Sequence, residues 1–484
     1  MAETAREDAR SVARRERLLL TLAGVFILLN HVTLILARGR AVTILWPVGV
    51  WAAGAALGHR VLTRRLPHRD PLLFPLAMFL TGWGLNLIAR LVPRYAYRQT
   101  LWMVVGLAAL VALTTALPRN LRWLRRYRYT WLLSGLALLV LTIAIGQNPA
   151  HTGPRLWLRV GPVHYQPSEL LKILLVAFLA SYFADHQRYM REDTVRLWRW
   201  EVPSPAFLGP LLLMWGLCVV MLIWQRDLGA ATLFFVVFTL MLYLASGHML
   251  LLVGGAGLLV LAGGIGVFVF DVVALRARIW LDPWSTANSD AYQIVQSLQA
   301  IAAGGVFGQG IGQGAPTLIP VVHSDFAFAA LAEEWGLLGA LAAVAALTVL
   351  VVRGLRIAAQ ARQPFRALLA AGLSLLIGVQ SLLILGGTLK LVPLTGITLP
   401  FVSYGGSALL TAFVEVGLLL VLSAERDRSP HRARAQSGRA AVRFQRTQSG
   451  SAALRRAERG AGGAPPRPQP PTPHPAADGN AVLR

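Results

Sequence analysis

Long apolar runs recur along this chain, and they constrain its fold more than any other feature. Each run approaches the length that an α-helix needs to cross the ~30 Å hydrocarbon layer of a bilayer. Because lipid offers the backbone no hydrogen-bonding partners, such runs must be helical. The sequence therefore predicts an all-α polytopic membrane protein with about twelve transmembrane helices, near residues 18–37, 42–57, 72–92, 99–117, 130–146, 169–186, 206–224, 227–246, 249–270, 326–352, 367–389 and 403–423.

Composition agrees with this class, since 55% of the 484 residues are hydrophobic and 14% are charged. The chain has a single cysteine, Cys218, and this excludes an intrachain disulfide. Cys218 falls in the seventh run. The first run follows a charged start and is as long as a membrane span, so we interpret it as a retained anchor rather than a cleaved signal. From about Arg426 the tail is rich in Arg, Ser, Gly and Pro, and we expect it to be disordered.

Arginine marks one side of the predicted bundle. Most arginines fall on the same side when twelve spans are counted, and positive charge is typical of the cytoplasmic side, so both termini are expected to be cytoplasmic. The formal charge of +24 could indicate nucleic-acid binding. Topology and anionic lipid explain its distribution better, and we expect no nucleic acid partner. The arginine-rich segments are 6–17, 58–71, 118–129, 187–205, 353–366 and the tail.

Candidate residues for chemistry gather on the opposite, extracytoplasmic side. This position argues against an enzyme that uses a cytosolic nucleotide. They lie in segments 147–168, 224–228, 271–325 and 390–402 or at the adjoining helix ends, and they are Arg155, Trp157, Glu169, Lys172, Asp227, His323, Asp325, Lys390, Ser403 and Tyr404.

The segment 271–325 is a long, polar, glycine-rich insertion that ends at Asp325, where the chain returns to the bilayer. A carboxylate at such a border is costly unless it performs chemistry, binds a partner or caps a helix. The glycine run 304–314 weakly resembles a phosphate-binding loop, but no strand precedes it. Turns between short re-entrant helices explain it better. His323 and Asp325 could ligate a metal, but two residues do not make a site.

Lys172 and Lys390 are the only lysines in an arginine-rich chain, and both lie at external helix ends. An ammonium group is a compact point charge that suits a phosphate. Glu169 is three residues from Lys172, so a salt bridge on one helix face explains that pair equally well. Three carboxylates deeper in their spans could form a proton path or pair with arginines of neighbouring helices. They are Glu333, Glu334 and Glu415.

Four blocks of residues carry a family resemblance. They run from Gly153 to Glu169, from Gln225 to Gly229, from Tyr292 to Glu334 and from Pro393 to Ser407. The third block includes Gln293, Gln296 and the motif His323-Ser324-Asp325-Phe326. In this order the blocks resemble the SEDS family (shape, elongation, division and sporulation), whose members include FtsW, RodA and SpoVE.

The resemblance implies a ten-helix catalytic core at 72–423, with its large external loop at 271–325. An added transmembrane hairpin at 18–71 would follow a basic cytoplasmic N-terminus at 1–17. A disordered, basic and proline-rich cytoplasmic tail would occupy 424–484. Three positions depart from the family pattern, because Val321 replaces a glutamate, Ser324 a threonine and Arg226 a proline.

What the resemblance implies is a peptidoglycan glycosyltransferase that polymerises lipid II, a disaccharide peptide linked to undecaprenyl diphosphate. It would act at the outer face of the cytoplasmic membrane, in division or elongation. Asp325 would be the general base for the acceptor hydroxyl. The diphosphate leaving group needs cations or a divalent metal such as Mg²⁺.

The other candidates would bind the substrate. Glu169, Lys172 and Trp157 would line the cavity, and Arg155, Lys172 or Lys390 could face the diphosphate. The remaining substrate-binding candidates are Asp227, Gln293, Gln296, His323, Ser403 and Tyr404.

Two other functions stay open on the sequence alone. A lipid II flippase would use Glu333, Glu334 and Glu415 as its inner path. A catalytically idle scaffold would only position a transpeptidase, and the valine at position 321 leaves this possibility open. The usual partner of the family is a class B penicillin-binding protein, a single-span transpeptidase. Division or elongation proteins are further expected partners.

Overall fold

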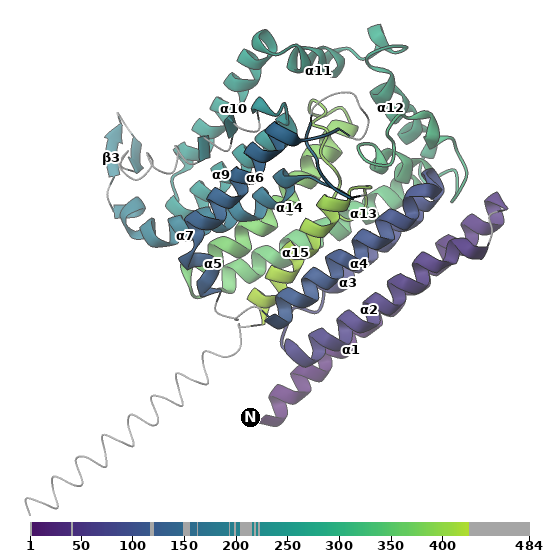
Figure 1. Cartoon of the computed structure of the whole chain (residues 1–484), viewed down its shortest axis with the longest axis horizontal. Helices are drawn as coiled ribbons and strands as arrows, with labels where there is room; N and C mark the ends of the chain where they lie inside the picture. Colours follow the sequence, from purple (N-terminus) through teal and green to yellow (C-terminus); the bar gives the residue numbers. More distant parts are fainter. Residues whose placement is uncertain are drawn as a thin grey trace, which may run out of the picture. The chain divides into compact units, whose positions relative to one another are not determined.

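The structure is a computed structural model that describes residues 2–39, 42–116, 121–148, 155–161, 163–192, 194–197, 200–203, 215–216, 219–220 and 223–424. Helices dominate these residues (Figure 1). The elements are α1 (Ala2–Arg38), η1 (Val42–Leu45), α2 (Trp46–Arg65), α3 (Leu73–Leu91), α4 (Pro93–Ala116), α5 (Arg122–Arg126), α6 (Arg128–Ile145), β1 (Leu158–Val160), β2 (Val163–Tyr165), α7 (Pro167–Glu192), β3 (Thr194–Leu197), β4 (Trp200–Pro203), α9 (Leu228–Ser246), α10 (Met249–Val269), α11 (Asp271–Leu281), η2 (Trp284–Thr286), α12 (Tyr292–Gly304), η3 (Pro316–Leu318), α13 (Ala327–Gln360), α14 (Pro364–Thr388) and α15 (Gly406–Ser423).

The predicted class, an all-α polytopic membrane protein, is confirmed. Within the described residues ten helices are long and apolar enough to cross a membrane, namely α1, α3, α4, α6, α7, α9, α10, α13, α14 and α15. The second predicted run coincides with α2, which is less apolar because it carries Arg60, Arg64 and Arg65. The seventh run, 206–224, lies mostly outside the described residues, as do Cys218 and residues 425–484 of the tail.

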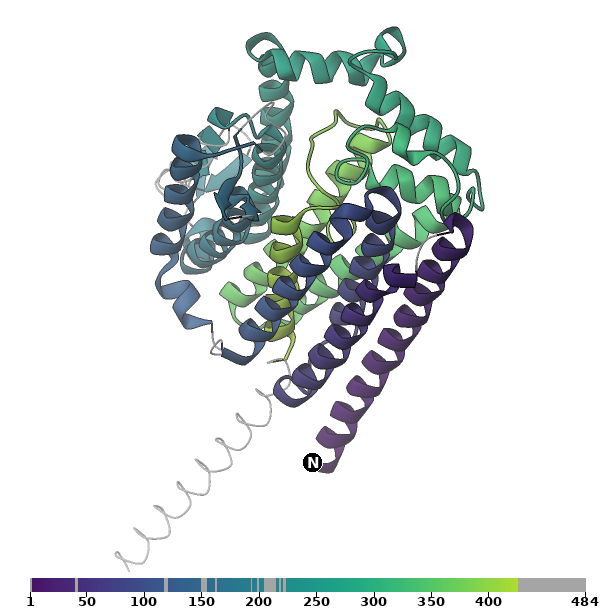
Figure 2. The same cartoon turned by 45° about the vertical axis from the view of Figure 1, so that its right-hand side comes forward.

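The centre of the bundle is built from largely apolar helices that are buried on most of their faces. In α7 every residue from Leu171 to Phe183 is buried. A helix that is hydrophobic all round must be covered by other elements or by lipid. Helices α3, α14 and α15 are likewise mostly buried, whereas α10 is mostly exposed. Figure 2 shows the green and yellow-green α14 and α15 inside the bundle and the purple α1 and α2 at its edge.

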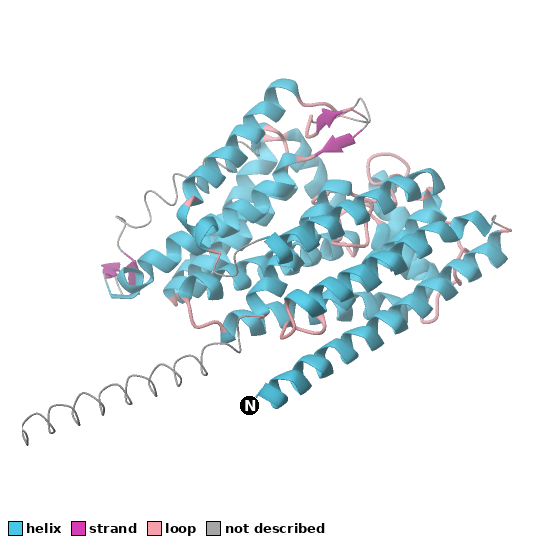
Figure 3. Cartoon of the chain, turned by 60° about the horizontal axis from the view of Figure 1, so that its bottom comes forward, coloured by secondary structure: helices cyan, strands magenta, loops and turns pink. Residues whose placement is uncertain are grey.

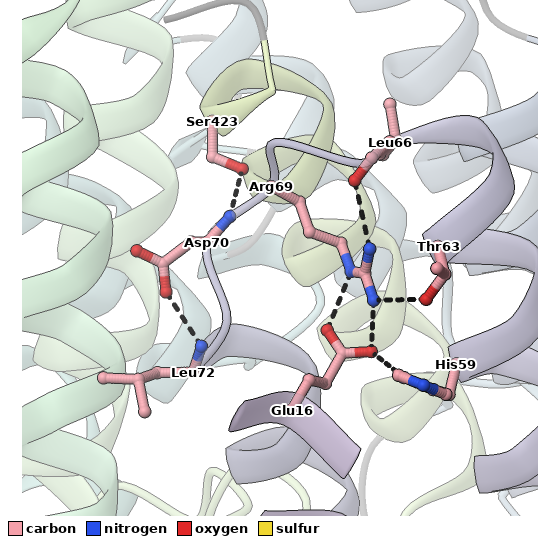
Figure 4. Close-up of polar contacts among 8 residues, drawn as sticks. All are labelled: Glu16, His59, Thr63, Leu66, Arg69, Asp70, Leu72 and Ser423. Carbon is pink, nitrogen blue, oxygen red and sulfur yellow. Dashed lines mark hydrogen bonds and ion pairs between the residues drawn. The ribbon is translucent and has the colours of Figure 1, made fainter. Parts of the chain in front are cut away.

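Buried charges attach the N-terminal hairpin of α1 and α2 to the bundle (Figure 4). Arg69 donates from Nη2 to Glu16 Oε1 at 2.5 Å and from Nε to Glu16 Oε2 at 2.7 Å. The next residue, Asp70, accepts a bond from Arg353 Nε at 2.8 Å, and its backbone N–H donates to Ser423 Oγ at 3.1 Å. The linker between α2 and α3 therefore connects α1 with α13 and α15.

Two short antiparallel β-hairpins interrupt the helices, and Figure 3 shows their strands in magenta. In the first, Leu158 pairs with Tyr165 and Val160 with Val163. Gly161 follows β1 with φ +60°, a backbone conformation that glycine adopts at little cost. The second hairpin joins β3 to β4. Both stretches fall in segments predicted to be loops, because strands of three or four residues give almost no periodic signal.

Candidate active site

Asp325 lies in the turn that leads into α13, and the loop between α14 and α15 holds this turn in place. Ser403 Oγ donates to the carbonyl oxygen of Ser324 at 2.6 Å. The backbone N–H of Tyr404 donates to the carbonyl oxygen of His323 at 2.8 Å. On the other side, the Phe326 side chain is fully buried. The third and fourth sequence blocks therefore meet at Asp325.

An aromatic cluster covers the same turn. The rings of Tyr95 and Tyr404 stack with centroids 4.7 Å apart, and the His323 ring lies 5.3 Å from Tyr95 and 5.6 Å from Tyr404. The guanidinium of Arg94 lies 5.1 Å from the Tyr95 centroid. Gln99, also on α4, donates from Nε2 to the carbonyl oxygen of Ser403 at 3.2 Å. The start of α4 thus packs against the turn that carries Asp325.

Burial raises the pKa of Asp325 above its usual value, while a hydrogen bond from Ser324 and the charge of Arg276 partly oppose this rise. Arg276 comes from α11, and its Nη1 donates to the carbonyl oxygen of Thr395 at 3.2 Å. Burial, and then the charge of Arg94, lowers the pKa of His323. Asp325 is therefore a carboxylate with enhanced basicity beside a histidine that favours its neutral form.

Asp227 caps α9, which gives it a clear structural role. Its Oδ1 accepts the backbone N–H of Ala230 at 3.1 Å, as the N-cap position of a helix requires. Its Oδ2 accepts bonds from Ser168 Oγ at 3.2 Å and Gln166 Nε2 at 3.3 Å. The backbone N–H of Gln166 in turn donates to Ser407 Oγ at 2.9 Å. These bonds bring together the starts of α7, α9 and α15.

Lys172 and Glu169 form the salt bridge that their spacing allows, with Nζ and Oε2 2.6 Å apart. Lys172 is buried, and its Nζ also donates to Gln380 Oε1 at 2.9 Å. Gln380 Nε2 continues the chain to the carbonyl oxygen of Thr398 at 2.8 Å. Glu415 on α15 is also buried, and the charges of Lys172 and Glu169 act on it. The hydrogen bonds of this network link α7 with α14 and with the loop before α15.

Backbone groups of the glycine run 304–314 form hydrogen bonds around a break in α13. These bonds explain the run as a structural feature rather than a phosphate-binding loop. Gly336 interrupts the helix with φ +64°, which frees backbone groups on both sides. Gln309 N–H donates to the carbonyl oxygen of Glu333 at 2.9 Å, and Leu337 N–H donates to that of Gly305 at 2.9 Å. A Cβ at Gly308 would lie 2.3 Å from the Glu334 carbonyl oxygen, so only glycine fits there.

The three deep glutamates belong to two separate groups. Glu334 Oε1 accepts a bond from Arg90 Nε at 3.0 Å, and both side chains are buried. Glu333 Oε1 accepts the backbone N–H of Ala315 at 2.8 Å. Glu333 and the Arg90–Glu334 pair therefore contact the glycine-rich segment, whereas the charges that act on Glu415 are those of Lys172 and Glu169. This arrangement agrees with the arginine-pairing interpretation for Glu334 rather than with one shared proton path.

The other sequence candidates are more dispersed. Arg155 is exposed, and the half-buried Trp157 exchanges two backbone hydrogen bonds with Gln147. Gln293 and Gln296 are half-buried on α12, three residues apart. Lys390 donates from Nζ to the carbonyl oxygen of Leu281 at 3.4 Å. The two lysines thus contact different elements, α14 for Lys172 and the end of α11 for Lys390.

Sequence reasoning missed several residues that the fold brings to the site, chiefly Tyr95, Gln99 and Gln380. In the sequence they appear only as single polar residues within apolar helices, and a single polar residue is weak evidence for a functional site. Among the described residues, Gln99 Oε1, Thr395 Oγ1 and Thr398 Oγ1 are buried side-chain atoms without a hydrogen-bond partner.

In the described part of the chain no group of three or more His, Cys, Asp or Glu side chains is placed to hold a metal ion. A Mg²⁺ ion at this site would therefore take most of its oxygen ligands from a diphosphate and from water, as Mg²⁺ commonly does in phosphate-transferring enzymes.

Comparison with known proteins identifies relatives over most of the chain. The family model described as cell cycle protein, for FtsW, RodA and SpoVE, matches residues 89–428. The peptidoglycan glycosyltransferase RodA of Mycobacterium bovis is 36% identical over 379 residues, which cover 75% of this chain and 80% of the relative. The probable peptidoglycan glycosyltransferase FtsW of Geobacter metallireducens is 34% identical over 335 residues, covering 69% and 86%.

Solved structures share the fold. A chain from the structure described as "Structural coordination of polymerization and crosslinking by a peptidoglycan synthase complex" superposes with a TM-score of 0.61 at 25% identity, covering 75% of this chain and 99% of that one. The crystal structure of the rod shape determining protein RodA of Thermus thermophilus gives a TM-score of 0.54 at 25% identity, covering 75% and 98%.

Proposed function

Because this chain belongs to the FtsW/RodA/SpoVE family, we propose that it is a peptidoglycan glycosyltransferase that polymerises lipid II, with Asp325 as its general base. In the reaction, a sugar hydroxyl of the acceptor attacks the anomeric carbon of the donor. The new C–O bond forms as the bond from that carbon to the diphosphate oxygen breaks. Asp325 accepts the hydroxyl proton, and the polyprenyl diphosphate leaves.

The observation that carries this role is the setting of Asp325. Its backbone neighbours are fixed by Ser403 and Tyr404, so the carboxylate has a defined position. Burial raises the pKa of Asp325, which brings its basicity closer to the working pH. His323 and Tyr404 lie in the same aromatic cluster and are suited to contact a sugar ring.

Arg276 is the cation that we assign to the diphosphate. Its side chain donates to the carbonyl oxygen of Thr395, and its charge acts on both Asp325 and Asp227, which supports this assignment. Lys172 already holds Glu169 and Gln380 in a buried network, and we therefore give it a structural role. A guanidinium can form two parallel hydrogen bonds to phosphate oxygens and so stabilise the charge that develops on the leaving group.

The membrane position of the site suits a lipid-linked substrate. Asp325 immediately precedes α13, one of the helices long and apolar enough to cross a membrane. A donor held there could keep its polyprenyl chain in the bilayer while its sugars enter the site. We propose that this face is extracytoplasmic and that both termini are cytoplasmic, since the arginine-rich loops lie at the opposite ends of the helices.

A transpeptidase partner is part of the proposal. One structural relative is a chain of a peptidoglycan synthase complex that coordinates polymerisation with crosslinking. By analogy we propose that a class B penicillin-binding protein joins this chain. Strands made here would then pass to the partner for crosslinking.

The purified chain with its transpeptidase, reconstituted in vesicles with labelled lipid II, tests the function. A polymerase yields glycan strands from lipid II supplied on the active-site side. A flippase would move lipid II between leaflets without strands, and a scaffold would do neither. Glu415→Gln serves as the comparison variant, because the flippase needs this carboxylate while the polymerase reaction does not route a proton through it.

A further inference from the structure

A basic pocket lies at the end of the bundle away from Asp325. It has a volume of about 350 Å³ and is lined by Arg122, Arg125, Arg126, Arg128, Tyr129 and Asp185. Asp185 is 16 residues beyond Glu169 in α7, or roughly 24 Å along the helix at ~1.5 Å per residue. Four arginines against one aspartate leave this pocket with a large positive charge.

Internal contacts hold two of the four arginines, Arg125 and Arg128. Arg125 and Arg128 each donate to a different carboxylate oxygen of Asp185. Arg128 Nη1 also donates to Ser181 Oγ at 3.0 Å and to the Ser181 carbonyl oxygen at 3.2 Å. The guanidinium groups are therefore held in place before any ligand binds, which lowers the entropic cost of binding.

The aromatic residues around the pocket are those of a membrane interface. Tyr127 and Tyr129 are 48% and 47% exposed, and their rings lie 5.7 Å from the Arg126 guanidinium and 5.2 Å from that of Arg128, respectively. Trp123 and Trp131 pack with centroids 4.6 Å apart. Tyr and Trp gather where a bilayer meets water, so the pocket lies at headgroup depth.

An apolar surface continues from the pocket along α6. Leu133, Val140 and Leu141 are exposed, and their spacing places them on one face of the helix. Because α6 qualifies as a membrane span, this face is suited to contact acyl chains. The basic pocket is suited to bind a charged headgroup, and the apolar face of α6 is suited to contact the hydrocarbon chains attached to that headgroup.

We propose that this pocket binds the phosphate of an anionic phospholipid, with the acyl chains lying along α6. Arginine is the residue best suited to a phosphate diester, since its planar fork reaches two oxygens at once. The exposed apolar face of α6 favours a lipid over a water-soluble phosphate compound. The proposal does not depend on the catalytic role of Asp325.

Binding is measured on the purified full-length chain by native mass spectrometry, titrated with phosphatidylglycerol or with phosphatidylcholine. Phosphatidylglycerol binds the wild type more tightly. The double variant Arg122→Gln, Arg126→Gln loses roughly 25-fold in affinity, since each basic residue near an anionic headgroup contributes about fivefold. The control Arg60→Gln, Arg64→Gln removes two exposed arginines from α2 and keeps wild-type affinity. Melting temperatures verify that both variants fold.

Three outcomes would overturn the proposal. Equal affinity for the two lipids would show that the headgroup charge is not recognised. An equal loss in the Arg60 and Arg64 control would show that net charge, rather than the pocket, attracts the lipid. Competition by soluble glycerol phosphate as strong as that by phosphatidylglycerol would assign the pocket to a free phosphate compound instead.

Discussion

The Ser403 hydroxyl donates a hydrogen bond of 2.6 Å to the backbone carbonyl oxygen of Ser324, the residue before Asp325. The same hydroxyl oxygen accepts the backbone N–H of Leu399 at 3.0 Å. One buried side chain therefore connects the loop before α15 with the turn before α13. The position of Asp325 depends on this connection.

Replacing Ser403 with alanine should lower the polymerisation rate more than it lowers stability. Misplacing a catalytic group by about 1 Å can cost roughly 100-fold in rate, whereas one lost hydrogen bond costs about 1 kcal/mol of folding free energy. Strand synthesis and thermal melting measure the two effects. Ser381→Ala is the matched control, because this buried hydroxyl donates to the carbonyl oxygen of Ile377 within its own helix, α14. Equal rate losses in the two variants would contradict the positioning role.

Removing the charge of Arg276 should shift the pH dependence of the reaction. The guanidinium lowers the pKa of Asp325, so Arg276→Gln raises that pKa further. A general base must be deprotonated, and the acid limb of the rate profile therefore moves to higher pH. Arg278→Gln, an exposed neighbour on α11, leaves the limb in place. An unshifted limb in Arg276→Gln would separate this arginine from the base.

The raised pKa of Asp325 also predicts a stability effect. A carboxyl group whose pKa is higher in the folded state holds its proton more tightly there, so folding becomes less favourable as pH rises through that pKa. At neutral pH the wild type carries this cost and Asp325→Asn does not. The variant should melt at the same or a higher temperature than the wild type at neutral pH. A markedly lower melting temperature would mean that the charged carboxylate stabilises the fold.

The buried pair of Arg90 and Glu334 should show strong coupling. Arg90→Ala leaves the Glu334 carboxylate unpaired in the interior, which costs roughly 3–5 kcal/mol. The double variant Arg90→Met, Glu334→Leu removes both charges and recovers most of the loss. The melting temperatures of the wild type, Arg90→Met, Glu334→Leu and the double variant together form a double-mutant cycle. Additive losses would show that the two side chains do not depend on each other.

Glycine at position 308 should be irreplaceable. An alanine Cβ there would lie 2.3 Å from the Glu334 carbonyl oxygen, and the backbone has φ +84°. Gly308→Ala should therefore lower the melting temperature and increase hydrogen exchange across residues 304–316. Gly257→Ala is the control, since its Cβ would point into open space on α10. Similar melting temperatures for both variants would contradict the bracing role of the glycine run.

The sequence predicted local features well and distant pairings poorly. Span positions follow from run length, and the Glu169–Lys172 pair follows from a spacing of three residues. Arg90 and Glu334 are 244 residues apart, and Ser403 and Ser324 are 79 apart, so no local pattern joins them. The motif that contains Asp325 can be recognised in the sequence. The break at Gly336 in the helix that follows, α13, depends on how the backbone packs, and no sequence pattern predicts it.

The most direct test of the central claim is lipid II polymerisation by the purified chain with its transpeptidase, comparing the wild type with Asp325→Asn. The substitution keeps the size of the side chain and removes its basicity. We predict glycan strands from the wild type and a loss of at least about 100-fold in the variant, the lower range for a general base. Strand synthesis at the wild-type rate by a folded Asp325→Asn complex would contradict the assignment of Asp325 as the base.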